Sequence, residues 1–275
     1  MVQIYGRPPF LLESIDGLGD VDSDFQSQKT PYQDGVDYID SILQERPIPI
    51  TFVILADNPN DLSLKKRLVS EVFNPKHGLG KMTYNFYGRE YEIEAGSEHV
   101  PSFPSGVSNR GVTYQRVMVD LIAPDPYWKE PRQVSRSLRA YQGKFKLPFK
   151  FPVEFGIKGD TTNLYNSGDT DAPITIDIEG PIKRPQIINE TTGRRLIVNR
   201  SLSEGEVLHI DTNPLKKRVE IYRDGEMLEK AMGYIDHYSD FFQLATGGNE
   251  IKFIADEGSM NAIVAISWRN RFTGI

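Results

Sequence analysis

Three aspartates at alternate positions, Asp20, Asp22 and Asp24, have the spacing with which an EF-hand calcium loop begins. In such a loop the sixth residue is a glycine and the twelfth is a glutamate that binds the ion through both oxygens. Here the sixth position is Phe25 and the twelfth is Pro31, so the pattern fails. The sequence therefore predicts a solvated acidic segment at this point and no metal site.

Residues suited to catalysis occur in the chain without a recognisable catalytic spacing. There is no GxSxG elbow, no P-loop and no GxGxxG after a strand, and the chain has no cysteine. Its four histidines lie far apart, with no HExxH or HxH pattern: His77, His99, His209 and His237. Carboxylates are numerous, but no two of them stand out as a glycosidase pair. We therefore predict no enzyme activity, no catalytic residue and no cofactor.

One stretch mixes cations with aromatic residues. Its lysines and phenylalanines are interleaved as Lys144, Phe145, Lys146, Phe149, Lys150 and Phe151. Such a patch can bind single-stranded nucleic acid. Lysines on an edge strand also prevent that strand from pairing with other chains, and we favour an edge strand or a linker.

The composition describes a globular chain that can bury a large core. Of its 275 residues 39% are hydrophobic and 25% are charged, which allows one large domain or two of ordinary size. The net charge of −6 argues against a surface that grips nucleic acid over its whole extent. The longest apolar run, Ile50 to Ala56, is too short to cross a membrane. We see no secretory signal at the start and expect a cytoplasmic protein, or one released by lysis.

A proline-rich stretch near the middle predicts a junction between two domains. Pro124, Pro126 and Pro131 remove backbone donors and disfavour helix in the residues before them. Tyr127 and Trp128 are too large and apolar to stay fully wet, and we expect them to pack the connector against a neighbour. The residues assigned to this interdomain junction are Pro124, Asp125, Pro126, Tyr127 and Trp128.

Before the junction, the pattern is that of an α+β domain. An amphipathic helix is expected over Leu62 to Phe73, capped by Asn60 or Asp61. Its apolar stripe is formed by Leu64, Leu68 and Val72, with Val69 and Phe73 alongside. Strands are expected on either side of this helix, at residues 46–56, 82–86, 90–95 and 113–122. Residues 13–38 and 96–111 read as long loops, and the first is acidic enough to be an extended arm.

After the junction, nearly every segment reads as a strand. Ile174, Ile176 and Ile178 alternate with polar residues, which is typical of a half-buried antiparallel strand. Asp224-Gly225 between two apolar runs predicts a tight hairpin. Turn signals recur about every 8–12 residues, the spacing of a β-sandwich or barrel.

The order and spacing of many features together resemble the distal tail proteins of long-tailed phages that infect Gram-positive bacteria. In the first half they are Gly17-Leu18 before an acidic stretch, Asp34-Gly35, Arg46-Pro47-Ile48-Pro49-Ile50, the helix Leu62 to Phe73, and Ala123-Pro124-Asp125-Pro126-Tyr127. In the second half they are Gly180, Pro185, Ile187, Thr192-Gly193, Gly205-Glu206, Ile210-Asp211-Thr212, Phe242-Gln243-Leu244, Gly248-Asn249 and Trp268.

The resemblance implies a mainly β protein with one N-terminal helix. Residues 1–131 would be a ring-forming α+β domain with an extended arm, and residues 132–275 an antiparallel β-sandwich of galectin-like shape. Six copies would form a ring at the tail tip of the virion, assembled in the cytoplasm of the bacterial host. One face would meet the major tail tube protein and the other the tail-associated protein or fibre. DNA would pass through the channel without specific binding, and no membrane is involved.

Within that reading, residues 13–38 and 97–111 are the candidate arms that clasp a neighbouring copy, with plain solvated loops as the alternative for each. A different class of function, a carbohydrate-binding module for attachment to the host surface, would require an exposed aromatic platform with convergent polar groups. Trp128 and Trp268 are the only tryptophans, and we expect both to be packing residues. A glycoside hydrolase is a third reading and would require two carboxylates paired in a cleft.

Overall fold

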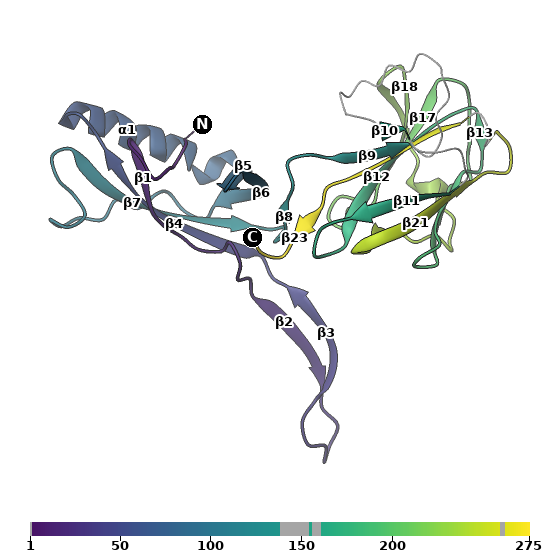
Figure 1. The fold of residues 1–275 in the computed structure, drawn as a ribbon, viewed down its shortest axis with the longest axis horizontal. Helices are drawn as coiled ribbons and strands as arrows, with labels where there is room; N and C mark the ends of the chain where they lie inside the picture. The colour runs from purple at the N-terminus through teal and green to yellow at the C-terminus, as the bar shows by residue number, and fades with distance from the viewer. Residues whose placement is uncertain (1, 138–153, 156–160, 259–261) are drawn as a thin grey trace. The chain divides into compact units, whose positions relative to one another are not determined.

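The structure is a computed structural model that describes residues 2–137, 154–155, 161–258 and 262–275 (Figure 1). These residues are mainly β-strand with one α-helix, which confirms the predicted fold class. The lysine- and phenylalanine-rich stretch at residues 144–151 lies outside the described residues. No helix in the described ranges is both long enough and apolar enough to span a membrane.

The chain divides into two compact units, Met1–Trp128 with Thr273–Ile275, and Lys129–Phe272. It passes from the first to the second within β8 (Trp128–Lys129) and returns after β23 (Arg271–Phe272). The sequence analysis did not anticipate that the last three residues belong to the first unit. The roles assigned to residues 1–131 and 132–275 stay predictions.

The first unit is built on an antiparallel sheet of five strands. The strand order is β1-β4-β7-β6, and β5 pairs with β6. The strands are β1 (Phe10–Ile15), β4 (Arg46–Leu55), β5 (Gly80–Phe86), β6 (Arg89–Ser97) and β7 (Tyr114–Ala123). Alternate residues of β4 and β7 are buried, so these two long central strands carry most of the core of this unit.

The single helix, α1 (Pro59–Val72), starts earlier than predicted and shows a different face to the core. Asn58 caps it, because its side chain accepts a hydrogen bond of 3.0 Å from the backbone N–H of Asp61. Leu62 and Val69 are buried, whereas Leu64 and Leu68 are 59% and 39% exposed. The predicted cap was therefore wrong, and the predicted stripe was wrong for Leu64 and Leu68 but right for Val69. A 3₁₀ turn, η1 (Pro75–His77), follows.

The second unit contains two main sheets. The larger has the strand order β10-β9-β22-β12-β17-β18-β19, with β20 paired to β12, and the smaller has the order β11-β21-β14-β15. The larger sheet is made of β9 (Val134–Ser137), β10 (Glu154–Phe155), β12 (Ala172–Glu179), β17 (Glu206–Asp211), β18 (Arg218–Arg223), β19 (Glu226–Lys230), β20 (Gln243–Leu244) and β22 (Ile263–Trp268). The smaller is made of β11 (Thr161–Asn166), β14 (Gln186–Asn189), β15 (Arg194–Ile197) and β21 (Gly247–Ile254). A short pair, β13 (Ile182–Lys183) with β16 (Ser201–Leu202), and a 3₁₀ turn, η2 (Met232–Tyr234), complete the described elements.

Both sheets of the second unit contribute to one hydrophobic core. Ile174, Ile176 and Ile178 of β12 pack in it as predicted, together with Ile251 and Phe253 of β21 in the smaller sheet. The Asp224-Gly225 hairpin joins β18 to β19, also as predicted. Two sheets that share one core define a β-sandwich.

Candidate functional site

A β-hairpin projects from the first unit where the sequence suggested an acidic extended arm or long loop (Figure 1). Its strands, β2 (Ser23–Gln28) and β3 (Asp37–Leu43), pair with each other and with no other described strand. We call residues 20–45 the arm. Of the two expectations for residues 13–38, the long loop was wrong, because β1 ends at Ile15 and a paired hairpin starts at Ser23; the extended arm fits the hairpin.

The arm exposes apolar side chains that a finished protein surface usually covers. Phe25 and Tyr38 are each 58% exposed and contact each other across the two strands, with ring centroids 5.1 Å apart. Ile39 and Ile42 are 61% and 55% exposed. An isolated two-stranded hairpin is only marginally stable in water. Exposed apolar groups on such an element indicate a surface that another molecule covers.

The arm is also strongly acidic. Seven carboxylates are opposed by the single cation Lys29, which gives this segment a net charge of −6: Asp20, Asp22, Asp24, Asp34, Asp37, Asp40 and Glu45. The whole chain has the same net charge, −6, so the remainder of the molecule is close to neutral. The acidic character of the protein is therefore concentrated in one protruding element.

Arg46 holds the root of the arm. Its guanidinium is fully buried and donates to the carbonyl oxygens of Pro126, at 2.7 Å, and Gly17, at 2.9 Å. It also donates to those of Asp20, at 3.2 Å, and Thr273. One side chain thus joins the start of the arm, the proline-rich stretch and the last residues of the chain.

The charge of Arg46 is balanced by these carbonyl dipoles, and no ion pair to a carboxylate is found for it among the described residues. Burial lowers the pKa of the Arg46 guanidinium, and the nearby charge of Asp20 opposes that shift. Because a buried cation is costly unless its donors are satisfied, the surrounding backbone must stay in place around it.

The five residues assigned to the junction fall at the end of the first unit. Pro126 is buried and its carbonyl oxygen accepts from Arg46, while Pro124 is exposed. Trp128 is fully buried, and its ring lies 6.3 Å from that of Tyr84, centroid to centroid. The role of Pro124, Asp125, Pro126, Tyr127 and Trp128 as an interdomain junction stays a prediction.

The structure separates the two candidate arms, because residues 97–111 are tied back to β7. Ser102 and Met118 exchange backbone hydrogen bonds of 2.9 and 3.0 Å. Gln115 is buried and donates to the carbonyl oxygens of Pro104, at 3.0 Å, and Asn109, at 3.3 Å. This segment is therefore a fixed loop on its own sheet, and only the hairpin reaches outward.

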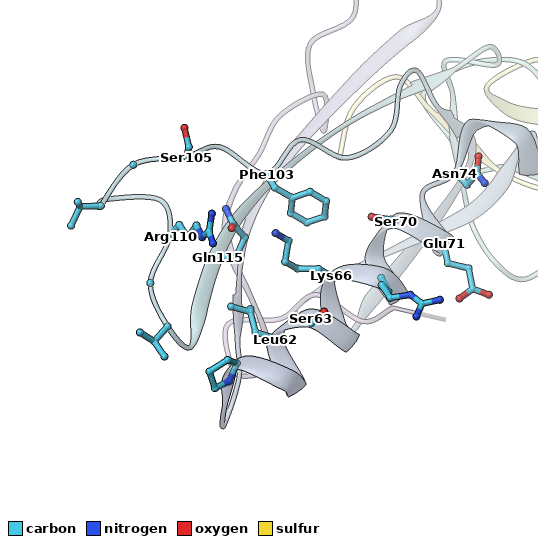
Figure 2. Close-up of a pocket in the computed structure, with 16 residues that line it drawn as sticks. Leu62, Ser63, Lys66, Ser70, Glu71, Asn74, Phe103, Ser105, Arg110 and Gln115 are labelled. Carbon is cyan, nitrogen blue, oxygen red and sulfur yellow. The ribbon is translucent and has the colours of Figure 1, made fainter.

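Between this loop and α1 lies an open groove (Figure 2). Its volume is about 1290 Å³. Pro59, Leu62 and Ser70 line it from the helix. Val107 and Val112 line it from the loop and are 91% and 72% exposed. We call this the α1 groove.

The α1 groove is positively charged. Lys66 and Arg67 from the helix and Arg110 from the loop line it, against one carboxylate, Glu71. The Lys66 ammonium lies 4.6 Å from the centroid of the Phe103 ring (Figure 2). Neither Arg67 nor Arg110 forms an ion pair within the described ranges. Two exposed guanidinium groups are thus available to an acidic partner.

Neither tryptophan forms the exposed platform that the carbohydrate-binding reading requires. Trp128 is fully buried and Trp268 is 3% exposed, so neither can supply an exposed platform for a sugar. His99 pairs with Asp120 at 2.8 Å and His209 with Asp177 at 2.7 Å, at separate places. No group of three or more His, Cys, Asp or Glu residues that could hold a metal ion is found in the part of the chain that is described.

Sequence reasoning missed the buried clamp at Arg46 and the α1 groove. The sequence analysis named Arg46 only within the run Arg46-Pro47-Ile48-Pro49-Ile50. Burial of a single arginine produces no periodic pattern in the sequence that would predict it. Lys66 and Arg67 lie on the predicted helix and Arg110 in the candidate arm at residues 97–111, and no pattern in the sequence indicates that these two segments face each other. Counting charge by segment would have isolated the arm, because seven carboxylates face one lysine over residues 20–45.

Two family models match the chain in its two halves. The phage tail protein RIFT-related domain matches residues 2–105, and the C-terminal domain of the siphovirus-type tail component matches residues 167–272. An N-terminal unit of the first kind followed by a sandwich of the second defines a structural component of a phage tail. The chain belongs to the family of siphovirus distal tail proteins. No curated protein matches it in sequence.

Solved structures of phage tail proteins share the fold over nearly the whole chain. The crystal structure of the Dit protein of phage SPP1, described as a paradigm of the hub adsorption apparatus in phages infecting Gram-positive bacteria, has a TM-score of 0.66. The identity is 14%, over 96% of this chain and 93% of that one. Two structures of the phage P2 baseplate in its activated conformation also match. The structure with Ca has a TM-score of 0.54 and 8% identity, and the structure with Sr has a TM-score of 0.55 and 7% identity. Each of these two matches covers 97% of this chain and 92% of the matched baseplate chain.

Proposed function

We propose that this protein is the hub subunit of the distal tail, and that six copies close into a ring. The ring joins the tail tube protein on one face to the tail-associated protein or fibre on the other. This proposal rests on the family, and on the likeness to a fold that serves as a hub in phage SPP1. The ring is assembled in the host cytoplasm and acts in the virion as part of the host adhesion device.

The observation that carries the proposal is the protruding arm. A closed ring forms when each copy contacts the next through a head-to-tail interface whose rotation divides a full turn. Such an interface needs two different surfaces on one subunit. The arm, with Phe25, Tyr38, Ile39 and Ile42 exposed, supplies one of them.

The chemistry of the chain suits a conduit. Contacts that neutralise phosphates bind DNA strongly, and a channel through which DNA must pass should avoid them. The part of the chain outside the arm is close to neutral and so carries no excess of positive charge, which fits a channel that does not bind DNA specifically. The protein acts by geometry and not by catalysis. The second unit serves as a spacer of galectin-like shape, and residues Pro124 to Trp128 form its junction with the ring domain.

The test is the mass of the purified protein by light scattering over a wide concentration range, with negative-stain images of the same fractions. We expect rings with an open centre and a mass of about six subunits. A matched variant replaces residues 24–42 by a two-residue turn. It keeps the root, where the Gln44 N–H donates to the Asp22 carbonyl oxygen at 2.9 Å.

The shortened variant should fold and remain a monomer. A full-length protein that stays monomeric, alone and when mixed with its tube and fibre partners, contradicts the ring proposal. Rings that form equally well without the arm contradict its role in closure and leave the ring itself standing.

A further inference from the structure

The arm requires a counterpart on another molecule. At about 3.3 Å per residue, its first leg from Ser23 to Pro31 extends roughly 30 Å from the body of the unit. Tyr32, at the tip, is fully exposed, and Val36 is 50% exposed. No described strand outside the hairpin pairs with it. An acidic ribbon with exposed apolar residues is best covered by a surface that is both basic and apolar.

The α1 groove is such a surface. Its cations are Lys66, Arg67 and Arg110, and Val107 and Val112 add exposed apolar area beside them. With a volume of about 1290 Å³ it exceeds the 300–1,000 Å³ or so of a typical small-molecule pocket. Its size and open shape suit a segment of protein chain.

The charge of the α1 groove indicates which segment of protein chain it binds. The arm has a net charge of −6, which equals the net charge of the whole chain. The arm therefore carries all of the excess negative charge of this protein. Arms of neighbouring copies repel one another unless each meets positive charge. Arg67 and Arg110 in the α1 groove, which have no ion-pair partner among the residues that the structure describes, provide it.

We infer that the α1 groove of one copy receives the tip of the arm from the next copy. This rests on the proposed ring and specifies its head-to-tail contact. Asp34 and Asp37 of the tip face the cations of the groove. Tyr32 and Val36 cover Val107 and Val112. The guanidinium groups and the tip carboxylates then form charge-assisted hydrogen bonds, which are the stronger kind.

Cross-linking between two variants tests the contact directly, because the natural chain has no cysteine. One protein carries Asp34→Cys at the tip, and a second, of different size through a tag, carries Val107→Cys in the groove. They are mixed under assembly conditions and treated with a short bis-maleimide. We expect a covalent product that contains one chain of each size.

The control partner carries Tyr87→Cys, in the turn between β5 and β6, where the side chain is 93% exposed. If rings form but Asp34→Cys reacts with Tyr87→Cys and not with Val107→Cys, the groove is the wrong receptor and the ring proposal survives. If no assembly forms at any concentration, either alone or with the tube and fibre partners, the ring proposal itself fails. The mass measurement therefore separates the two failures.

A charge reversal supplies a second, independent readout. Arg110→Glu should raise the concentration needed for half-assembly on the order of tenfold, because a repulsive pair replaces an attractive one. Adding Asp34→Arg to the same chain should restore most of the loss. Arg89→Glu, at an exposed cation outside the groove, is the matched control and should change assembly little. Equal effects of Arg110→Glu and Arg89→Glu, with no rescue by Asp34→Arg, overturn the inference.

Discussion

Replacing Arg46 by methionine tests whether one buried cation holds the root of the arm. The methionine side chain keeps much of the apolar volume and removes every donor. The carbonyl oxygens of Gly17, Asp20, Pro126 and Thr273 then lose the hydrogen bonds that Arg46 gives them. Hydrogen bonds to a charged group contribute about 1.5–3 kcal/mol each, and burying the cation costs several kcal/mol in return.

We therefore expect Arg46→Met to lower the free energy of unfolding of the first unit by about 3 kcal/mol. For a unit of this size that corresponds to a decrease in Tm of roughly 10 °C. Arg46→Lys should lose about half as much, since a single ammonium cannot reach all of the carbonyl oxygens that lie around the planar guanidinium. The second unit should unfold at an unchanged temperature.

The measurement is scanning calorimetry, with hydrogen exchange of the backbone amides near Gly17 and Asp20. Exchange there should become faster in Arg46→Met before global unfolding. Arg89→Met, the same chemical change at an exposed site, is the matched control. If both variants unfold at the temperature of the natural protein, the carbonyl clamp contributes nothing and the reasoning is refuted.

Three further changes test single contacts. Asn58→Ala should cost about 1 kcal/mol by removing the helix cap, and Asn58→Gly only a few tenths, measured by thermal unfolding; equal costs would argue against the cap. Gly17 has φ +78° and a Cβ there would collide with the backbone of β4, whereas Gly35 has φ +80° with open space around it. Gly17→Ala should therefore destabilise clearly more than Gly35→Ala, by urea unfolding, and similar losses would contradict the packing. The hydrogen bond to Asp177 raises the pKa of His209. The pair therefore stabilises the second unit fully below about pH 6.5, and this contribution is lost as pH rises through the raised pKa. Its Tm should decrease over that range, and a slope that survives His209→Gln would refute the assignment.

The parts of the fold that the sequence predicted best are those with one face in a core. Ile174, Ile176 and Ile178 alternate with polar residues because β12 is buried on one side only, and a period of two is then visible. The Asp224-Gly225 turn was equally visible, since Asp224 has φ 53° and Gly225 φ 85°, values that few other residues adopt readily. In both cases a local physical constraint determines the residue type.

The two strands of the arm escaped prediction for the opposite physical reason, although an extended arm was expected in this part of the chain. Neither face of β2 or β3 packs on a core of its own chain, so the alternation that indicates a strand is weak. A register shift between Gln26 and Ser27 interrupts it further. The Arg46 clamp also lies beyond sequence reasoning, because the carbonyls that Arg46 binds come from segments up to 227 positions away in the chain.

The incorrect prediction that Leu64 and Leu68 of α1 face the core has a different physical cause. Leu64 and Leu68 repeat at the spacing of a core-facing stripe, yet they are 59% and 39% exposed, while Leu62 and Val69 are buried. A helix with apolar residues on two faces buries both only when a second body covers the outer one. The same reasoning applies to Phe25 and Ile42 of the arm. Because residue patterns reflect burial in the complete assembly, we expect the exposed Leu64 and Leu68 to lie on a surface that a neighbouring molecule covers.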